Sequence, residues 1–408
     1  MKIKICAALF FLVLITAFPA YAVTVGLMYG SSAPAQLEVA SGDGLMCGET
    51  ALSAAVTVKN ENGVINIYDK ETGNMLDCGS PLEIKAGGNI FKLNDVRYRG
   101  SIILSVDGAG IRAVNNVDVD DYVCGVVPKE VSASWNPEAL KAQAVISRTL
   151  LYSSFMGKHD GFDVCATANC QVYGGYDVET KNTNAAVEAT KGLVVKYNGK
   201  PAQTYFSAGN GGYTADSSDV WTAALPYLTE RPDPYEKWNE IKGLSWYANV
   251  TKDEIKAAVQ KYGKDIGEIK NVKVTATSPA GRVTELTVTG TLGEYKFKKN
   301  AASYALGLRS QFYTLSGGDS VHTTDGTTDG NIYALDSDGT AKAANSYALD
   351  TSGVVKIETG TGVYTFSGRG YGHGVGLSQW GAYEMADEGF TYDKILEFYY
   401  PGTALEKI

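Results

Sequence analysis

Short runs of alternating apolar and polar residues fill the chain from Val23 to about residue 115. The clearest runs lie at 55–58, 64–68 and 101–106, and breaks rich in Gly, Asn and Asp separate them. Alternation with a period of two places successive side chains on opposite faces of a strand, so the pattern predicts antiparallel strands joined by hairpins. We therefore expect a β-rich N-terminal region at 23–115.

The pattern changes after Val119. Asn136, Pro137 and Glu138 form a helix start, with an N-cap, a proline at the first helical position and an acid in the first turn. No helix breaker follows until Gly157. We expect further helices at 184–191, 252–262, 301–308, 377–388 and 391–400, and strands at 193–195, 272–277 and 284–288. The chain is therefore predicted to be α+β, with a mixed α/β body and a central groove at 116–408.

The stretch 316–360 interrupts this body. Tyr-Ala-Leu-Asp occurs at 333–336 and again at 347–350, each time followed by a turn that contains glycine. Two copies are too few for a solenoid. A calcium loop beginning at Asp336 is excluded, because its twelfth position is Tyr347 and not Glu. We interpret 316–360 as an inserted β-hairpin.

The N-terminus has the layout of a secretory signal peptide over residues 1–22. Two lysines precede an apolar run from Ile5 to Phe18, and Ala20-Tyr21-Ala22 is a small-x-small cleavage site. An uncleaved membrane anchor is the alternative, although the apolar run is short for a full span. We expect export to the cell exterior or cell wall, with the mature chain starting near Val23.

Composition narrows the partners and the cysteine chemistry. The net charge of −9 argues against a nucleic-acid partner, because phosphate backbones are bound by basic surfaces. Five cysteines remain after Cys6 leaves with the signal peptide, so at least one is free, metal-bound or paired between chains. We expect a Cys47–Cys78 disulfide, while Cys124 has no assigned partner.

Residues 126–135, Val-Val-Pro-Lys-Glu-Val-Ser-Ala-Ser-Trp, contain the first candidate for chemistry. A carboxylate at Glu130 in an apolar stretch beside Trp135 would be desolvated, and burial keeps a carboxyl group protonated as a general acid. The alternative is a surface strand residue that pairs with Lys129.

The second candidate is the group His159, Cys165 and Cys170. Three soft ligands at short spacing indicate zinc, with Asp160, Asp163, water or substrate as the fourth ligand. The alternatives are a loop closed by a Cys165–Cys170 disulfide and two free thiols.

The third candidate is the glycine-rich run 368–381, which contains His373 and Gln379. Glycines let the backbone approach a ligand closely. The spacing is not that of a dinucleotide-binding fingerprint. A turn with a structural histidine is the alternative.

Taken together, these segments resemble the SpoIID/LytB family of peptidoglycan-acting proteins. The matching pieces lie at 127–135, 140–148, 170–173, 189–192, 372–382 and 399–403, which places the resemblance over roughly 95 to 405. The resemblance implies a lytic transglycosylase that acts on glycan strands stripped of stem peptides. It carries the catalytic Glu onto Glu130, the important helix arginine onto Arg148, and zinc ligands onto His159, Cys165 and Cys170. Many relatives have His where this chain has Asn169, which puts the metal in doubt.

Substrate contacts are expected from six side chains: Ser134, Trp135, Gln143, Tyr205, His373 and Gln379. Trp380 is a further stacking surface. A lytic transglycosylase manages with one carboxylate, because the 6-hydroxyl of the muramic acid attacks its own anomeric carbon and leaves a 1,6-anhydro end. Glu138 lies nearby, but its place in a first helical turn accounts for it. Arg148 is expected to hold the lactyl carboxylate or to orient Glu130.

Two other functions stay open. One is a non-catalytic glycan-binding module that enhances an amidase, as the LytB label suggests, and a second wall hydrolase is a possible partner in either case. The other is a zinc amidase that cuts stem peptides. Such a site would need more metal ligands than the three histidines of the whole chain readily supply.

Overall fold

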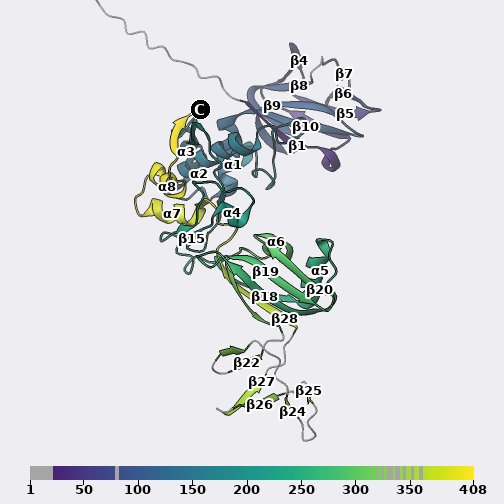
Figure 1. The fold of residues 1–408 in the computed structure, drawn as a ribbon. Helices are drawn as coiled ribbons and strands as arrows, with labels where there is room; N and C mark the ends of the chain where they lie inside the picture. Colours follow the sequence, from purple (N-terminus) through teal and green to yellow (C-terminus); the bar gives the residue numbers. More distant parts are fainter. Residues whose placement is uncertain are drawn as a thin grey trace, which may run out of the picture. The chain divides into compact units, whose positions relative to one another are not determined.

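The computed structural model describes residues 22–78, 82–318 and 362–408, and the backbone of six short strands between 321 and 357 (Figure 1). The expected signal peptide lies outside the described residues except for Ala22, which begins strand β1 (Ala22–Met28). In the described part of the chain, no helix is both long and apolar enough to cross a membrane. Export and cleavage near Val23 stay predictions.

The chain forms two compact units. The first takes in the described residues up to Val126 together with 156–178, and the second takes in 127–155 and 179–408. The domain boundary expected at 115/116 stays a prediction.

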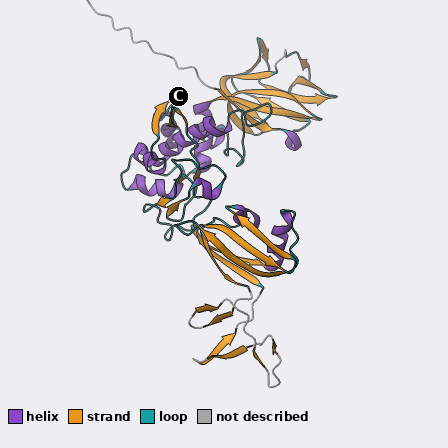
Figure 2. Cartoon of the chain, viewed as in Figure 1, coloured by secondary structure: helices purple, strands orange, loops and turns teal. Residues whose placement is uncertain are grey.

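The first unit is built on one large sheet, coloured as strand in Figure 2. Its strand order is β11-β1-β10-β9-β8-β2-β5-β6-β7, and β3 pairs with β4 and β8. The remaining strands are β2 (Gln36–Ala40), β3 (Leu45–Cys47), β4 (Thr50–Leu52), β5 (Ala55–Glu61), β6 (Val64–Asp69), β7 (Met75–Leu76), β8 (Glu83–Leu93), β9 (Val96–Asp107), β10 (Gly110–Asp118) and β11 (Val164–Cys165). The expected N-terminal hairpins are therefore confirmed.

The hairpin between β5 and β6 shows how local sequence sets this sheet. Asn62 and Gly63 both have positive φ, 56° and 84°, as a two-residue type I′ turn requires. Glu61 pairs with Val64 across the turn, and this register leaves Val56, Val58 and Ile67 buried in the core.

The thiols of Cys47 and Cys78 lie within hydrogen-bonding reach of each other in this unit. Both cysteines are free, so the expected disulfide is not formed in this structure. The two side chains are in contact instead. Burial, together with the Cys47 thiol, raises the pKa of Cys78 to about 12.

The second unit holds most of the helices. Helix α1 (Val119–Glu130) leads into it, followed by α2 (Pro137–Leu150), α3 (Lys181–Ala189), α7 (Gln379–Asp387) and α8 (Tyr392–Tyr399). Asn136 caps α2, because its side chain accepts a hydrogen bond from the Glu138 backbone N–H at 3.0 Å. The helix ends earlier than Gly157, since residues 151–155 continue as a π-helical turn. Strands β12 (Leu193–Tyr197), β13 (Lys200–Pro201) and β30 (Ala404–Lys407) form a small antiparallel sheet beside these helices.

The same unit contains a β-rich module with two three-stranded sheets. One has the order β17 (Ser245–Thr251), β28 (Val363–Arg369), β21 (Tyr313–Gly317), and the other β18 (Ile269–Thr277), β19 (Val283–Gly290), β20 (Gly293–Lys298). Helices α5 (Lys252–Lys261) and α6 (Ala301–Leu306) pack on this module, with Trp246, Phe297 and Phe366 in its core. The mixed α+β class predicted from the sequence is confirmed.

Three antiparallel strand pairs are described where one inserted hairpin was expected. They are β22 (Val321–Thr323) with β23 (Gly326–Thr328), β24 (Ala334–Leu335) with β25 (Ala341–Lys342), and β26 (Ser346–Asp350) with β27 (Gly353–Ile357). The first copy of the Tyr-Ala-Leu-Asp repeat lies partly outside the described residues.

Candidate functional site

Glu130 is the last residue of α1 and is half-buried. The strand placement that the sequence left open is therefore wrong. The Val131 N–H still bonds to the Val127 carbonyl at 3.1 Å, and the Trp135 N–H bonds to the Ser132 carbonyl at 3.0 Å. The chain thus turns within five residues from the end of α1 into the cap of α2, which fixes the backbone on both sides of the carboxyl group.

Two buried glutamines tie the end of α1 to α2 and α7. The Gln379 side-chain amide lies 3.3 Å from the Glu130 carbonyl oxygen and 3.3 Å from the Gln143 side-chain oxygen. The Gln143 amide in turn donates to the Ser147 hydroxyl at 3.1 Å. The structure therefore brings together three residues predicted for the site, and Gln143 and Gln379 position the Glu130 backbone from inside the fold.

Arg148 lies deep in the same unit, with only 1% of its surface exposed. Its guanidinium donates to the carbonyls of Leu193 at 3.1 Å and Val187 at 3.5 Å. These bonds hold α2 against the end of α3 and the start of β12. A substrate carboxylate has no access to a group buried in this way, so the geometry favours a positioning role over direct contact.

The turn that follows Glu130 forms part of the wall of an open pocket of about 470 Å³, although Glu130 itself does not line it. Ser134, Trp135, Lys141, Asn182 and Asp387 are among its lining residues. Ser134 is exposed, and its hydroxyl lies 3.0 Å from that of Ser132. The pocket offers hydroxyl, amide and ammonium groups beside an aromatic wall, which suits a polar ligand with apolar faces.

That aromatic wall joins α7 to the turn after α1. The Trp135 ring centroid lies 5.2 Å from that of Trp380 and 5.1 Å from that of Tyr383. Trp380 therefore packs against Trp135, and its expected role as a stacking surface for substrate stays a prediction. Glu138 serves the fold, because its carboxylate accepts from Lys141 at 2.6 Å and from the Tyr392 N–H at 2.8 Å.

His373 and Tyr205 form a separate aromatic group with Trp221. Ring centroids lie 4.8 Å apart for Trp221 and His373, and 4.6 Å apart for Tyr205 and Trp221. The His373 Nδ1 accepts the Val375 N–H at 3.0 Å. Burial, then the positive charge of Arg282, lowers the pKa of His373 to about 4. The imidazole is therefore neutral at physiological pH.

Backbone conformation and close packing require glycine at two positions near His373. Gly374 and Gly376 have φ of 72° and 71°, where L residues are strained. A Cβ on Gly376 would lie 2.1 Å from the Tyr205 carbonyl oxygen. This close approach lets β14 (Phe206–Ser207) pair in parallel with β29 (Leu377–Ser378).

Sequence reasoning missed a buried polar network beneath this loop. Glu236 accepts from the N–H groups of Asn210 at 2.6 Å and Gly211 at 2.8 Å, and from the Ser378 hydroxyl at 2.5 Å. Asp233 accepts from the Asn210 side chain at 2.6 Å and from the Tyr399 hydroxyl at 2.7 Å. No local motif indicates these acids, because their partners lie up to 166 positions away.

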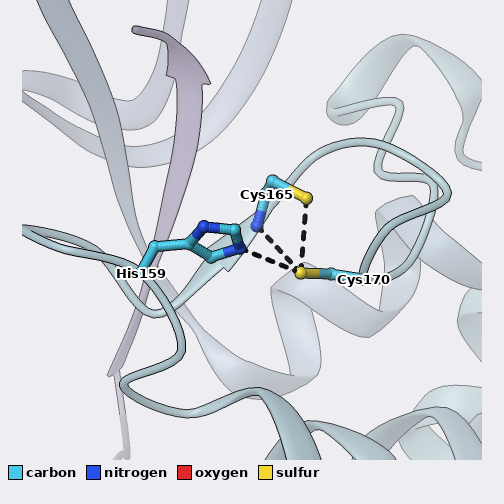
Figure 3. Close-up of side chains that lie close together, drawn as sticks. All are labelled: His159, Cys165 and Cys170. Carbon is cyan, nitrogen blue, oxygen red and sulfur yellow. Dashed lines mark hydrogen bonds between the residues drawn. The ribbon is translucent and has the colours of Figure 1, made fainter. Parts of the chain in front are cut away.

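The predicted metal ligands meet in the first unit (Figure 3). The His159 Nε2 lies 3.2 Å from the Cys170 Sγ, which lies 3.3 Å from the Cys165 Sγ. All three ligand atoms lie within 4.8 Å of one another. The loop is anchored by Asp163, whose carboxylate accepts from the Thr24 N–H and the Gly157 N–H, both at 2.9 Å.

This donor set fits a zinc ion with three protein ligands. The two cysteines are free thiols, and thiolate with imidazole is a donor set that zinc prefers. Burial opposes ionisation of Cys165, but hydrogen bonds from Thr167, Cys170 and Tyr29 together outweigh burial and lower the pKa of this thiol. Asp163 is already engaged, and no fourth His, Cys, Asp or Glu joins the group among the residues that the structure describes. A fourth ligand would therefore come from solvent or another donor type.

Comparison with known proteins gives two matches to family models. Residues 107–197, which include Glu130, Arg148 and the three candidate metal ligands, match the family described as Stage II sporulation protein, SpoIID. Residues 236–331 match a domain of unknown function. The first range is narrower than the resemblance expected over roughly 95 to 405.

Relatives extend the likeness over most of the chain. The chain is 32% identical over 355 residues to the protein named amidase enhancer of Bacillus subtilis, and the match covers 79% of this chain and 48% of that protein. The chain thus spans about half the length of that relative. It is 29% identical over 318 residues to Stage II sporulation protein D of the same organism, covering 72% of this chain and 76% of the relative. The resemblance seen in the sequence is confirmed: residues 107–197 match the SpoIID family model, and most of the chain is similar to proteins named Stage II sporulation protein D and amidase enhancer.

Proposed function

We propose that this protein acts on the bacterial cell wall as a lytic transglycosylase, cleaving the MurNAc–GlcNAc β-1,4 bond of denuded glycan with Glu130 as acid and then base. The observation that carries the proposal is the placement of Glu130. It ends α1, its backbone carbonyl accepts a hydrogen bond from Gln379, and the turn after it supplies Ser134 and Trp135 to the wall of the 470 Å³ pocket. The names of the relatives support a role in the wall or in sporulation.

The proposed chemistry requires one carboxyl group that transfers a proton twice. Glu130 first protonates the leaving glycosidic oxygen and then accepts the proton of the muramyl 6-hydroxyl as that oxygen bonds to the anomeric carbon. A hydrolase would require a second carboxylate to activate water or to attack the sugar. Asp387 lines the pocket, so it is the residue that separates the two mechanisms.

The test compares wild type, Glu130→Gln and Asp387→Asn on denuded glycan strands, with mass spectrometry of the products. We expect 1,6-anhydromuramic ends from wild type and from Asp387→Asn, and none from Glu130→Gln. Reducing ends together with inactive Asp387→Asn would replace the proposal by a hydrolase. No cleavage by wild type would leave the enzyme hypothesis without support.

The second candidate is a non-catalytic enhancer of an amidase, which the name of the B. subtilis relative favours. In that case wild type and Glu130→Gln would both bind glycan, cleave nothing, and increase the release of stem peptides by an added wall amidase to the same extent. A zinc amidase activity of the chain itself would instead release stem peptides without added enzyme, and chelation would stop it.

For the metal, we propose a structural zinc held by His159, Cys165 and Cys170. Bound there, zinc would tie the 157–170 loop to β11 and β1, whose residues Val25 and Val164 pair. Elemental analysis of the protein should find one zinc per chain. A Cys165–Cys170 disulfide in the peptide map, with no zinc, would contradict this proposal.

A further inference from the structure

A second pocket, of about 620 Å³, lies in the β-rich module at the ends of β17, β21 and β28. Five of its lining residues are aromatic: Trp238, Trp246, Tyr247, Phe312 and Tyr313. The volume falls within the range of about 300–1,000 Å³ that is typical of small-molecule sites. Most of the lining belongs to the segment that matches a domain of unknown function.

Arg369 gives this pocket a positive charge. Its guanidinium carbon lies 4.8 Å from the Trp238 ring centroid and 3.9 Å from that of Phe312. Among the described residues, no carboxylate forms an ion pair with Arg369, and no side-chain hydrogen bond engages its guanidinium. Stacked on two rings, the group is held in place with its hydrogen-bond donors unused, and arginine donors match a carboxylate in a two-pronged geometry.

Tyr313 and Tyr247 add two further features. Tyr313 is only 5% exposed, and its hydroxyl has no hydrogen-bond partner within the described part of the chain. This hydroxyl is buried, so Tyr313 contributes its ring and not its hydroxyl to the wall of the pocket. Tyr247 is 78% exposed in the wall of this pocket, so its ring is open to a ligand.

We infer that this pocket is a second glycan site, which takes an acidic N-acetylated amino sugar such as a muramyl residue. Aromatic faces stack against the C–H faces of a pyranose ring, and Arg369 pairs with the lactyl carboxylate. The choice of a muramyl sugar rests on the proposed wall function, whereas the geometry alone requires an anionic ligand with apolar faces. A glycan bound here would occupy a site separate from the 470 Å³ pocket that Ser134 and Trp135 line.

Fluorine NMR of the full chain labelled with 5-fluorotryptophan tests this inference. The five tryptophans report different places: Trp238 and Trp246 line this pocket, Trp135 lines the 470 Å³ pocket, and Trp380 packs against Trp135. The probe is the GlcNAc–MurNAc disaccharide, and the neutral GlcNAc–GlcNAc disaccharide is its control. We expect a saturable shift of the Trp238 resonance with the acidic probe, and binding at least about tenfold weaker with the neutral one.

Variants identify the groups. Arg369→Gln should weaken binding of the acidic probe, as followed at the Trp238 resonance, about tenfold. Arg369→Lys should retain part of the affinity. Tyr247→Ser should weaken both probes, while Tyr304→Ser, a matched tyrosine that is 70% exposed on α6, should weaken neither.

The inference is overturned if Trp238 does not respond up to about 10 mM probe, or if Arg369→Gln binds as wild type does. Its failure is distinguishable from failure of the proposed function. Glu130→Gln should keep the Trp238 response, and a wild type that cleaves glycan with a silent Trp238 would disprove only the second site.

Discussion

Replacing His373 by Gln should remove a specific dependence of stability on pH. Burial and the charge of Arg282 lower the pKa of His373 from 6.5 to about 4, so the folded protein binds fewer protons than the unfolded chain between these values. Stability from this residue is therefore complete above pH 6.5 and is lost as the pH falls toward 4. Gln retains an acceptor for the Val375 N–H.

The size of this pH effect on stability follows from the lowered pKa of His373. A full shift from 6.5 to 4 would cost about 2 kcal/mol on going from pH 8 to pH 5. The ring is half-buried and solvent screens part of its charge, so we expect about 1–2 kcal/mol. Asp233 and Glu236 act in the opposite direction, because burial raises the pKa of both carboxyl groups. Only the difference between wild type and His373→Gln isolates the imidazole.

The assay is urea unfolding of both proteins at several pH values from 5 to 8, with NMR titration of the histidine side chains as an independent readout. The stability advantage of wild type should shrink by about 1–2 kcal/mol as the pH falls from 8 to 5. An advantage that does not change with pH, or a folded-state His373 that titrates near 6.5, would refute the reasoning. A neutral His373 also excludes it as the general acid near neutral pH.

Four further changes have definite expected outcomes. Tyr399→Phe removes the hydroxyl 2.7 Å from Asp233 and should lower the free energy of unfolding by about 1–3 kcal/mol in urea; no change would mean that water replaces the bond. Gly374→Ala places a Cβ against the Arg282 guanidinium at φ 72°, so we expect a loss above about 2 kcal/mol in thermal unfolding, and a neutral result would contradict the steric argument. Gln379→Leu should lower kcat on glycan about tenfold with little change in KM, whereas a change confined to KM would indicate a binding role. Cys170→Ser should abolish zinc binding and lower Tm; unchanged metal content would exclude Cys170 as a ligand.

The parts of the fold that sequence predicted are those set by local signals. The Asn62-Gly63 turn needs no distant partner, and neither does the cap of α2 at Asn136. The grouping of His159, Cys165 and Cys170 could also be predicted from local sequence, because His159 and Cys170 are only 11 positions apart on one loop. Short separation lets spacing alone limit the geometry.

Glu130 was harder to place. Val126, Val127 and Val131 favour a strand, and Pro128 disfavours a helix interior, yet the segment ends α1. Tertiary contacts decide between these preferences: Val126 and Val127 are fully buried, and Gln379 reaches the Glu130 carbonyl from 249 positions away. No single-sequence pattern encodes a bond of that span.

The buried acids explain why the glycine-rich segment and the Glu130 segment work as one structure. Ser378 donates to Glu236 at 2.5 Å, and its hydroxyl also accepts the Gly381 N–H at 3.0 Å as the N-cap of α7. The next residue, Gln379, is the one that holds the Glu130 backbone. Burial of Glu236 therefore fixes the start of α7, and the start of α7 fixes Glu130. The Ser378–Glu236 bond is buried and the Gln379–Glu130 bond is part-buried, so the position of the candidate catalytic acid depends on hydrogen bonds that lead back into the core of the fold.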